Sequence, residues 1–178
     1  AAAGGVGQIF CQWAKSLGCK IIGTVGSDEK IKIAEKNGCD YVINYSKENF
    51  AEKVKEITNG LGVSVVYDGV GKKTFDQSIE CLKVRGTMVS FGNASGPLEP
   101  CNVTKSLAPK GLYLTRPSIA HYTSTREELD EAANKVFEMF ITKKIKLEIF
   151  KEYTLESIIN AHQDLENRKI LGPAIVIP

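Results

Sequence analysis

The feature that most constrains the fold is the opening run Ala1-Ala2-Ala3-Gly4-Gly5-Val6-Gly7, which leads directly into an apolar-periodic helix pattern. In the dinucleotide-binding pattern G-x-G-x-x-G, Ala2, Gly4 and Gly7 occupy the three glycine positions, with alanine in the first. The first position makes a tight turn, the second lets the backbone approach a pyrophosphate, and the third lets helix pack on strand. The following helix presents free N–H groups and its positive dipole end to an anion. The turn is therefore a candidate pyrophosphate site.

The residues after this turn give the motif its expected context. The helix pattern ends at Gly18, and residues 20–25 are typical of a short buried strand. A helix and strand in this order predict a mononucleotide-binding unit. The chain opens at Ala1, inside the turn and without Met, so we expect a fragment whose first strand and preceding domain lie outside it.

The rest of the chain alternates strand and helix patterns. Strands are expected at 41–43, 63–67, 86–91 and 111–116, and helices at 28–37, 48–58 and 73–82. This alternation predicts an α/β fold, a Rossmann doubly wound parallel sheet with helices on both faces, lacking its first strand. Ser27 is the expected N-cap of the second helix and Gly38 its C-cap glycine.

A tail follows the predicted sheet. Thr125-x-x-Glu128 is a capping signature that opens a long helix to about residue 142. Residues 145–150 show strand-like alternation, 155–166 an amphipathic helix pattern and 174–177 a final strand. We expect residues 1–143 to form the nucleotide-binding domain and 144–178 a separate C-terminal segment.

Composition excludes few classes of protein but indicates a compartment. The 178 residues carry a net charge of +2, which predicts neither nucleic-acid nor membrane binding. The cysteines are odd in number and scattered, which favours free thiols in a reducing cytoplasm over a disulfide frame or zinc site. We expect four of them to be small core residues: Cys11, Cys19, Cys39 and Cys81.

The choice of cofactor depends on the end of the second strand. An NAD site expects Asp or Glu about 20 residues past the glycine turn, but Gly26-Ser27 stand there. A small residue with a nearby cation suits a 2′-phosphate, and Lys30 and Tyr45 follow close to strand ends. These residues favour NADPH. Asp28-Glu29 are acidic neighbours that would suit the ribose of an NAD site, so this alternative stays open.

No acid–base or nucleophilic constellation stands out. His121 and His162 are the two histidines, one in a loop and one in a helix pattern. The sequence contains no Tyr-x-x-x-Lys, G-x-S-x-G, H-E-x-x-H or G-K-[ST] motif. A hydride-transferring enzyme whose chemistry resides in its cofactor needs few protein catalysts.

Six motifs in order resemble one family, the zinc-independent quinone oxidoreductases of the medium-chain dehydrogenase/reductase superfamily, which include zeta-crystallin. They are Ala1-x-x-Gly4-x-x-Gly7-Gln8 and residues 22–27 (IGTVGS), 42–45 (VINY), 66–71 (VYDGVG), 86–93 (GTMVSFGN) and 114–118 (LTRPS). The resemblance is with the bacterial branch and covers essentially the whole chain.

The resemblance implies an NADPH-dependent reductase of quinones or other small electrophilic acceptors, with a catalytic domain before this chain and no zinc. It implies these cofactor-binding residues: Gly4, Gly5 and Val6 at the pyrophosphate; Gly26, Ser27, Lys30 and Tyr45 at the 2′-phosphate; Val70, Phe91, Gly92 and Asn93 along the middle; Pro117, Ser118 and Ile119 at the nicotinamide; and Arg168 from the tail. The catalytic residues would lie outside the chain, and the tail would pack on the catalytic domain. A homodimer would form through the edge strand Tyr113–Thr115.

Other functions stay open at this point. An enoyl or enone reductase of the same superfamily shares this cofactor domain. A cofactor-holding, crystallin-like role and RNA binding belong to a different class. The lack of a basic stripe with aromatic residues argues against RNA.

Overall fold

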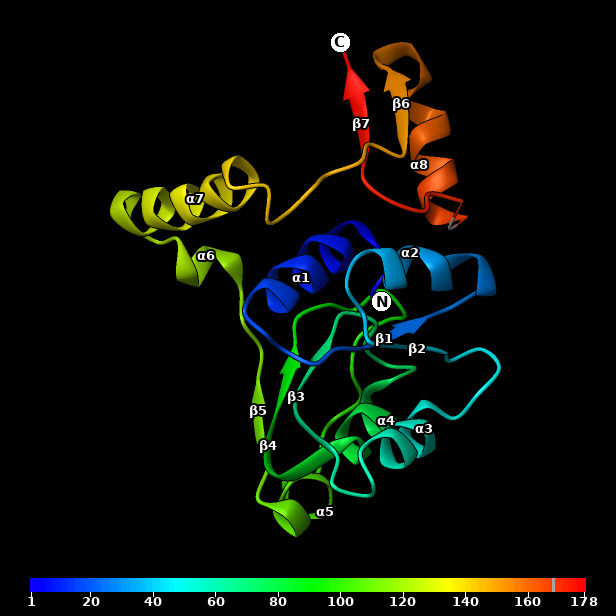
Figure 1. The fold of residues 1–178 in the computed structure, drawn as a ribbon, viewed down its shortest axis with the longest axis vertical. Coiled ribbons are helices and arrows are strands. Elements are labelled where there is room, and N and C mark those ends of the chain that lie inside the picture. Colours follow the sequence, from blue (N-terminus) through cyan, green and yellow to red (C-terminus); the bar gives the residue numbers. More distant parts are fainter. Residues whose placement is uncertain (168) are drawn as a thin grey trace. The chain divides into compact units, whose positions relative to one another are not determined.

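The computed structural model describes residues 1–167 and 169–178 and divides them into two compact units. The first unit contains Ala1–Ser46 and Lys135–Pro178, and the second contains Lys47–Asn134. Figure 1 traces the chain through both. Each described strand ladder is parallel, so the predicted α/β class with parallel strands is confirmed.

The first unit begins with the predicted helix, strand, helix and strand. These elements are α1 (Gly5–Ser16), β1 (Ile22–Val25), the short 3-10 helix η1 (Asp28–Lys30), α2 (Ile31–Lys36) and β2 (Tyr41–Asn44). Strands β1 and β2 pair from Ile22↔Tyr41 to Val25↔Asn44. Gly18 and Gly38 follow the ends of α1 and α2 with φ of +79° and +100°, which confirms both as helix-stopping glycines.

Small side chains form the core of this part. Ala2 and Ala3 of the turn pack with Val25, Ala34 and two cysteines, Cys11 and Cys39, whose sulfurs lie 3.6 Å apart. Cys11 and Cys39 are buried as predicted. The prediction for Cys19 was wrong: this side chain is exposed, because it follows Gly18 in the turn between α1 and β1.

The C-terminal part of the same unit contains β6 (Lys151–Thr154), η3 (Leu155–Ser157), α8 (Ile158–Glu166) and β7 (Ala174–Ile177). Strands β6 and β7 lie side by side (Figure 1). The last strand has the predicted bounds. The strand predicted at 145–150 was wrong: the strand begins only at Lys151. Lys146 instead pairs its backbone with a side-chain amide on α1, which replaces a strand partner.

The second unit has a three-stranded sheet with the order β3-β4-β5. Its elements are α3 (Phe50–Ile57), β3 (Val63–Asp68), α4 (Phe75–Glu80), β4 (Leu82–Ser90), α5 (Val103–Ser106), η2 (Ala108–Lys110), β5 (Tyr113–Thr115) and α6 (Ile119–Tyr122). Its core is built from Phe75, Ile79, Leu82 and Met88. Helix α7 (Arg126–Ile141) begins in this unit and ends in the first.

Helix caps explain where several elements begin. The predicted capping box is confirmed: Glu128 N–H donates to Thr125 Oγ1 (3.2 Å), and Thr125 N–H donates to Glu128 Oε2 (3.1 Å). Asn49 caps α3 by accepting N–H groups from the first helical turn, so this helix begins at Phe50. Ser27 is the N-cap residue of η1, as predicted, but its side chain makes no capping hydrogen bond.

Candidate cofactor-binding site

The glycine-rich turn leads into the first turn of α1, as the motif predicts. Gly4 is the N-cap residue, with φ −76° and ψ 170°, and its carbonyl accepts the Gln8 N–H across 2.9 Å. A Cβ on Gly7 would lie only 2.8 Å from the Ala2 carbonyl carbon, so glycine is needed for this close packing. The first helical turn is uncharged, so its N–H groups and dipole present positive potential to an anion.

The three residues predicted at the pyrophosphate are Gly4, Gly5 and Val6, and none of them is buried. Val6 is 67% exposed. A Cβ added to Gly5 would meet no heavy atom nearer than Pro173 Cγ at 4.0 Å, and one on Gly4 none nearer than 3.6 Å. The protein itself therefore leaves room above these two glycines, which is what the close approach of a pyrophosphate requires.

At the end of β1, Gly26 lies under the ring of Tyr45. A Cβ on Gly26 would come 2.7 Å from Tyr45 Oη and 3.1 Å from Cζ. Tyr45 is held in this place by its N–H, which donates to Val25 O (3.0 Å). The structure thus brings two predicted 2′-phosphate residues together, and Tyr45 occupies the space that a carboxylate side chain at position 26 would need.

A buried asparagine connects the loops after β1 and β2. Asn44, 4% exposed, donates from Nδ2 to Asp28 Oδ1 (2.7 Å) and accepts the Ser46 N–H at Oδ1 (3.0 Å). Ser46 Oγ in turn donates to Gly26 O (2.9 Å). Asn44 was not predicted as a site residue, and its only sequence signal was its place at the end of a strand.

Lys30 is the last residue of η1 and is half-buried. Its backbone N–H donates to Ser27 O (3.2 Å). Among the described residues, no ion pair involves its ammonium group, and the neighbouring Asp28 is engaged by Asn44. Ser27 and Lys30 therefore belong to one short turn beside Gly26, with a cation at its end.

In the second unit, Asp68 organises the loop that follows β3. Its buried carboxylate accepts N–H groups from Val70 (2.8 Å) and Gly71 (3.0 Å) at Oδ1. Its Oδ2 accepts hydroxyl groups from Thr74 (2.8 Å) and Ser78 (2.8 Å). These bonds fix the backbone conformation at Val70, so Asp68 acts on the loop and not on a ligand.

The loops after β3 and β4 are joined along their length. Phe91 N–H donates to Asp68 O (2.9 Å), and the Phe91 ring lies on Gly69, where a Cβ would approach Cζ to 2.8 Å. Gly92 packs equally closely, since its Cβ would lie 2.8 Å from Gly69 Cα. The Asn93 Cα lies 3.1 Å from the Cβ position of Gly71. The four predicted residues after these strands are thus brought together.

The remaining predicted residues follow β5 or lie in the tail. Pro117, Ser118 and Ile119 stand at the start of α6, and Ile119 is 81% exposed. Arg116, the residue before Pro117, donates from Nη1 to Ser90 O (2.7 Å) and ties the ends of β5 and β4 together. Arg168 lies outside the described residues.

Within residues 1–167 and 169–178, no three His, Cys, Asp or Glu side chains gather as a metal site would require. No helix in the same ranges combines the length and apolar character needed to cross a bilayer. The five cysteines are free.

Comparison with known proteins identifies the family. Residues 5–138 match the sequence profile of the family described as zinc-binding dehydrogenase. The quinone oxidoreductase of Salmonella typhimurium is 50% identical over all of this chain and 55% of its own length. The 2-haloacrylate reductase of a Burkholderia species is 41% identical, over all of this chain and 54% of its own. The chain spans about half the length of the curated relatives it matches.

Solved structures agree with these matches. The Escherichia coli quinone oxidoreductase complexed with NADPH superposes with a TM-score of 0.95 at 48% identity. The superposition covers all of this chain and 55% of the other. This chain therefore belongs to the zinc-binding dehydrogenase family, and it corresponds to the nucleotide-binding region of the family's quinone oxidoreductases.

Proposed function

We propose that this chain is the NADPH-binding part of a longer quinone oxidoreductase. The turn before α1 would hold the pyrophosphate, and Gly26, Ser27, Lys30 and Tyr45 the adenosine 2′-phosphate. One observation carries the choice of NADPH: Tyr45 Oη occupies the space over Gly26 where an NAD-binding protein would place its carboxylate. The E. coli relative with NADPH bound, at 48% identity, supports the same choice.

The position of Asp28, one of the two acidic neighbours of Gly26, supports the same choice. The Asp28 carboxylate accepts the Asn44 amide at 2.7 Å, and a buried asparagine holds it there. Lys30, at the end of the same turn, would neutralise the extra phosphate. An ammonium close to a phosphate favours binding through charge-assisted hydrogen bonds.

When bound, NADPH would supply the hydride that reduces the acceptor. The chain's own residues would bind and orient it. Gly5 and Val6 present N–H groups beside Gly4, whose own N–H donates to Ala1 O (3.3 Å). Val70 with Phe91, Gly92 and Asn93 offers two joined loops for the middle of the cofactor. Pro117, Ser118 and Ile119, and Arg168 from the tail, complete the proposed set.

We also propose how this chain packs on the rest of the complete protein and on a second copy of it. Ala2 N–H donates to Thr24 O (2.9 Å), so the chain enters the turn alongside β1, where a preceding strand of the complete protein would pair. The segment 144–178 would pack on a catalytic domain, which the exposed apolar residues of β7 support. A homodimer would form through β5, an outer strand on which Tyr113 is 63% exposed.

A second candidate function is reduction of an activated alkene. It is favoured by one observation, the 41% identity to the 2-haloacrylate reductase. Both reactions would use the same cofactor site, and the acceptor would be chosen mainly by residues outside this chain.

The test is a titration of the complete protein with NADPH and NADH, followed by steady-state assays on quinones and on haloacrylates and enones. We expect NADPH to bind tighter and quinones to be reduced faster. Tighter binding of NADH, or binding of neither, would contradict the NADPH site. Reduction of alkenes alone would favour the second candidate.

A further inference from the structure

Two glutamines one turn apart on α1 bind the C-terminal segment of the same unit. Gln8 donates from Nε2 to Leu171 O (3.0 Å), 163 residues away. The same Nε2 also donates to Ala3 O (2.9 Å), a carbonyl of the glycine-rich turn. An amide nitrogen has two hydrogens. Gln8 therefore uses both, one on the turn and one on the tail.

The tail lies close to the turn on either side of this contact. A Cβ on Gly172 would come within 3.1 Å of Gln8 Nε2 and 3.2 Å of Phe150 Cβ. Pro173 Cγ is the heavy atom nearest to the Cβ position of Gly5, at 4.0 Å. Phe150 N–H donates to Pro173 O (2.7 Å) and fixes this stretch of the tail. Residues 171–173 thus border the start of α1.

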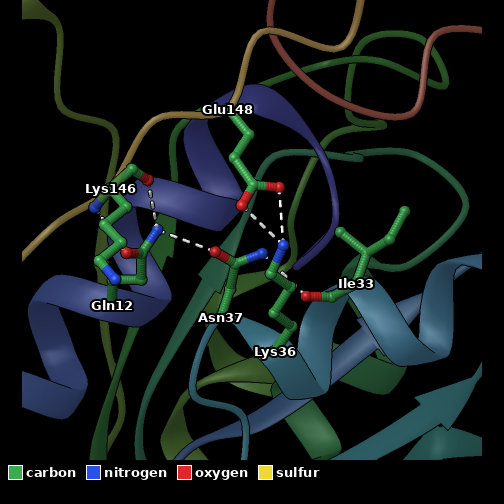
Figure 2. A network of polar contacts seen from close by, with 6 residues as sticks. All are labelled: Gln12, Ile33, Lys36, Asn37, Lys146 and Glu148. Carbon is green, nitrogen blue, oxygen red and sulfur yellow. Dashed lines mark hydrogen bonds and ion pairs between the residues drawn. The ribbon is translucent and has the colours of Figure 1, made fainter.

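Gln12 holds a different part of the tail and does not touch the turn. Its Oε1 accepts the Lys146 N–H (2.8 Å), and its Nε2 donates to Lys146 O (3.0 Å) and Asn37 Oδ1 (2.8 Å). Lys36 Nζ bridges both carboxylate oxygens of Glu148 at 2.7 Å. Figure 2 shows these side chains meeting between α1, α2 and the tail. Gln12 Nε2 also donates to Gln8 O (3.2 Å). Gln12 therefore joins α1, Asn37 and residue 146 of the tail, and among the described residues its side chain makes no hydrogen bond to the glycine-rich turn.

We propose that Gln8 is a positioning residue that links nucleotide binding at the glycine-rich turn to the seating of residues 171–173. The proposal rests on the function proposed above. One rigid amide contacts both segments. Displacement of the tail therefore moves the Gln8 side chain and breaks its hydrogen bond to Ala3 O. By reciprocity, a nucleotide that orders the turn also protects the tail.

The link is independent of cofactor selectivity. Among the described residues, the Gln8 side chain donates to Ala3 O and Leu171 O and makes no hydrogen bond to the turn after β1 or to the loop around Tyr45. Its loss should therefore weaken NADPH and NADH equally, because both carry the same pyrophosphate.

The experiment compares Gln8→Met with Gln12→Met in the complete protein. Methionine has nearly the shape of glutamine but no N–H donors, and the second variant releases the tail only at Lys146. We expect Gln8→Met to weaken both nucleotides by about 3- to 10-fold with an unchanged NADPH/NADH ratio. Gln12→Met should stay within about 2-fold of wild type. Gly172→Ala changes no residue of α1 but places a Cβ 3.1 Å from Gln8 Nε2, so it should shift both affinities in the same direction as Gln8→Met.

Hydrogen exchange gives a readout that a merely structural residue would not change. In wild type, NADPH should slow amide exchange at residues 169–172, and in Gln8→Met this slowing should be lost while β1 keeps its protection. Unchanged affinities in Gln8→Met, equal losses in Gln12→Met, or persistent NADPH-induced protection of 169–172 in Gln8→Met would each overturn the link. If wild type binds neither nucleotide, the proposed function fails together with it. If wild type binds both nucleotides but NADPH does not slow exchange in the tail, the proposed link is contradicted and the proposed function is not.

Discussion

Asn44 donates a hydrogen bond to Asp28 across 2.7 Å, from the end of one parallel strand to the turn that follows its neighbour. This contact orients one of the two carboxylates that follow Gly26-Ser27 in the sequence. Asn44 is buried, and its Oδ1 accepts Ser46 N–H. A residue with no proposed ligand contact thereby orients a group of the proposed 2′-phosphate site.

The first prediction follows from this contact. Asn44→Ala removes the amide that orients the Asp28 carboxylate, so this carboxylate can turn closer to the ribose hydroxyls of NADH and to the 2′-phosphate of NADPH, which it repels. We expect the ratio of NADPH to NADH affinity to fall by about 2- to 12-fold, since a typical hydrogen bond contributes about 0.5–1.5 kcal/mol net. Calorimetric titration with both nucleotides measures it. Adding Asp28→Asn to Asn44→Ala should restore the ratio, and no restoration would assign the effect to misfolding of the loop.

Lys30→Ala tests the phosphate site directly. Loss of the ammonium should weaken NADPH by about 10- to 150-fold, the equivalent of about 1.5–3 kcal/mol, and leave NADH almost unchanged. Lys32→Ala is the matched control, because Lys32 is an exposed lysine of α2 two residues further on. Equal losses for both nucleotides would remove Lys30 from the phosphate site.

Local signals in the sequence predicted local structure well. The glycines after α1 and α2, the capping box at Thr125 and the bounds of β7 depend on neighbouring residues, and all are confirmed. Periodicity also placed β1, β2, β3 and β5 close to their observed bounds. These features could be read without knowing what each segment packs against.

The features that could not be predicted are contacts between residues that lie far apart in the sequence. The alternation at 145–150 is strand-like, but Lys146 pairs with the Gln12 amide, 134 residues away, instead of a strand. Neither the Asn44–Asp28 contact nor the Gln8–Leu171 contact has a local signature, because Asn and Gln side chains accept many partners. The predicted site residues themselves remain predictions.

The Asp68 cluster predicts a contrast between two equally buried serines. Ser78 Oγ donates to the Asp68 carboxylate, whereas Ser90 Oγ has no hydrogen-bond partner among the described residues. Ser78→Ala should lower the free energy of unfolding by about 1–3 kcal/mol, and Ser90→Ala should leave it unchanged or raise it slightly. Urea denaturation measures both. Similar losses in the two variants would show that burial, and not the carboxylate contact, decides the effect.

Cysteine reactivity should follow burial. Burial raises the pKa of Cys81 to about 12, so its reactive thiolate is scarce at pH 8, while Cys19 is exposed. Iodoacetamide at pH 8 should therefore modify Cys19 first and leave Cys81 unmodified until the protein unfolds. Peptide mass spectrometry over a time course gives the order. Modification of Cys81 at the rate of Cys19 in native protein would contradict the packing of α4 on β4.

The contacts of Asp164 predict a dependence of stability on pH in the C-terminal part. Lys151 Nζ and Tyr153 Oη donate to Asp164 Oδ2 at 2.7 and 2.8 Å, and these hydrogen bonds lower the pKa of the carboxyl. A lowered pKa in the folded state means that the charged form stabilises the fold above the unfolded pKa of about 3.9. This stabilisation is lost as the pH falls from about 3.9 through the lower pKa that Asp164 has in the folded protein.

Asp164→Asn should therefore unfold at a lower temperature than wild type at pH 6, and the difference should shrink progressively below about pH 4. Thermal melts at several pH values measure the difference. If it stays constant down to pH 2, the carboxylate charge does not hold α8 to β6.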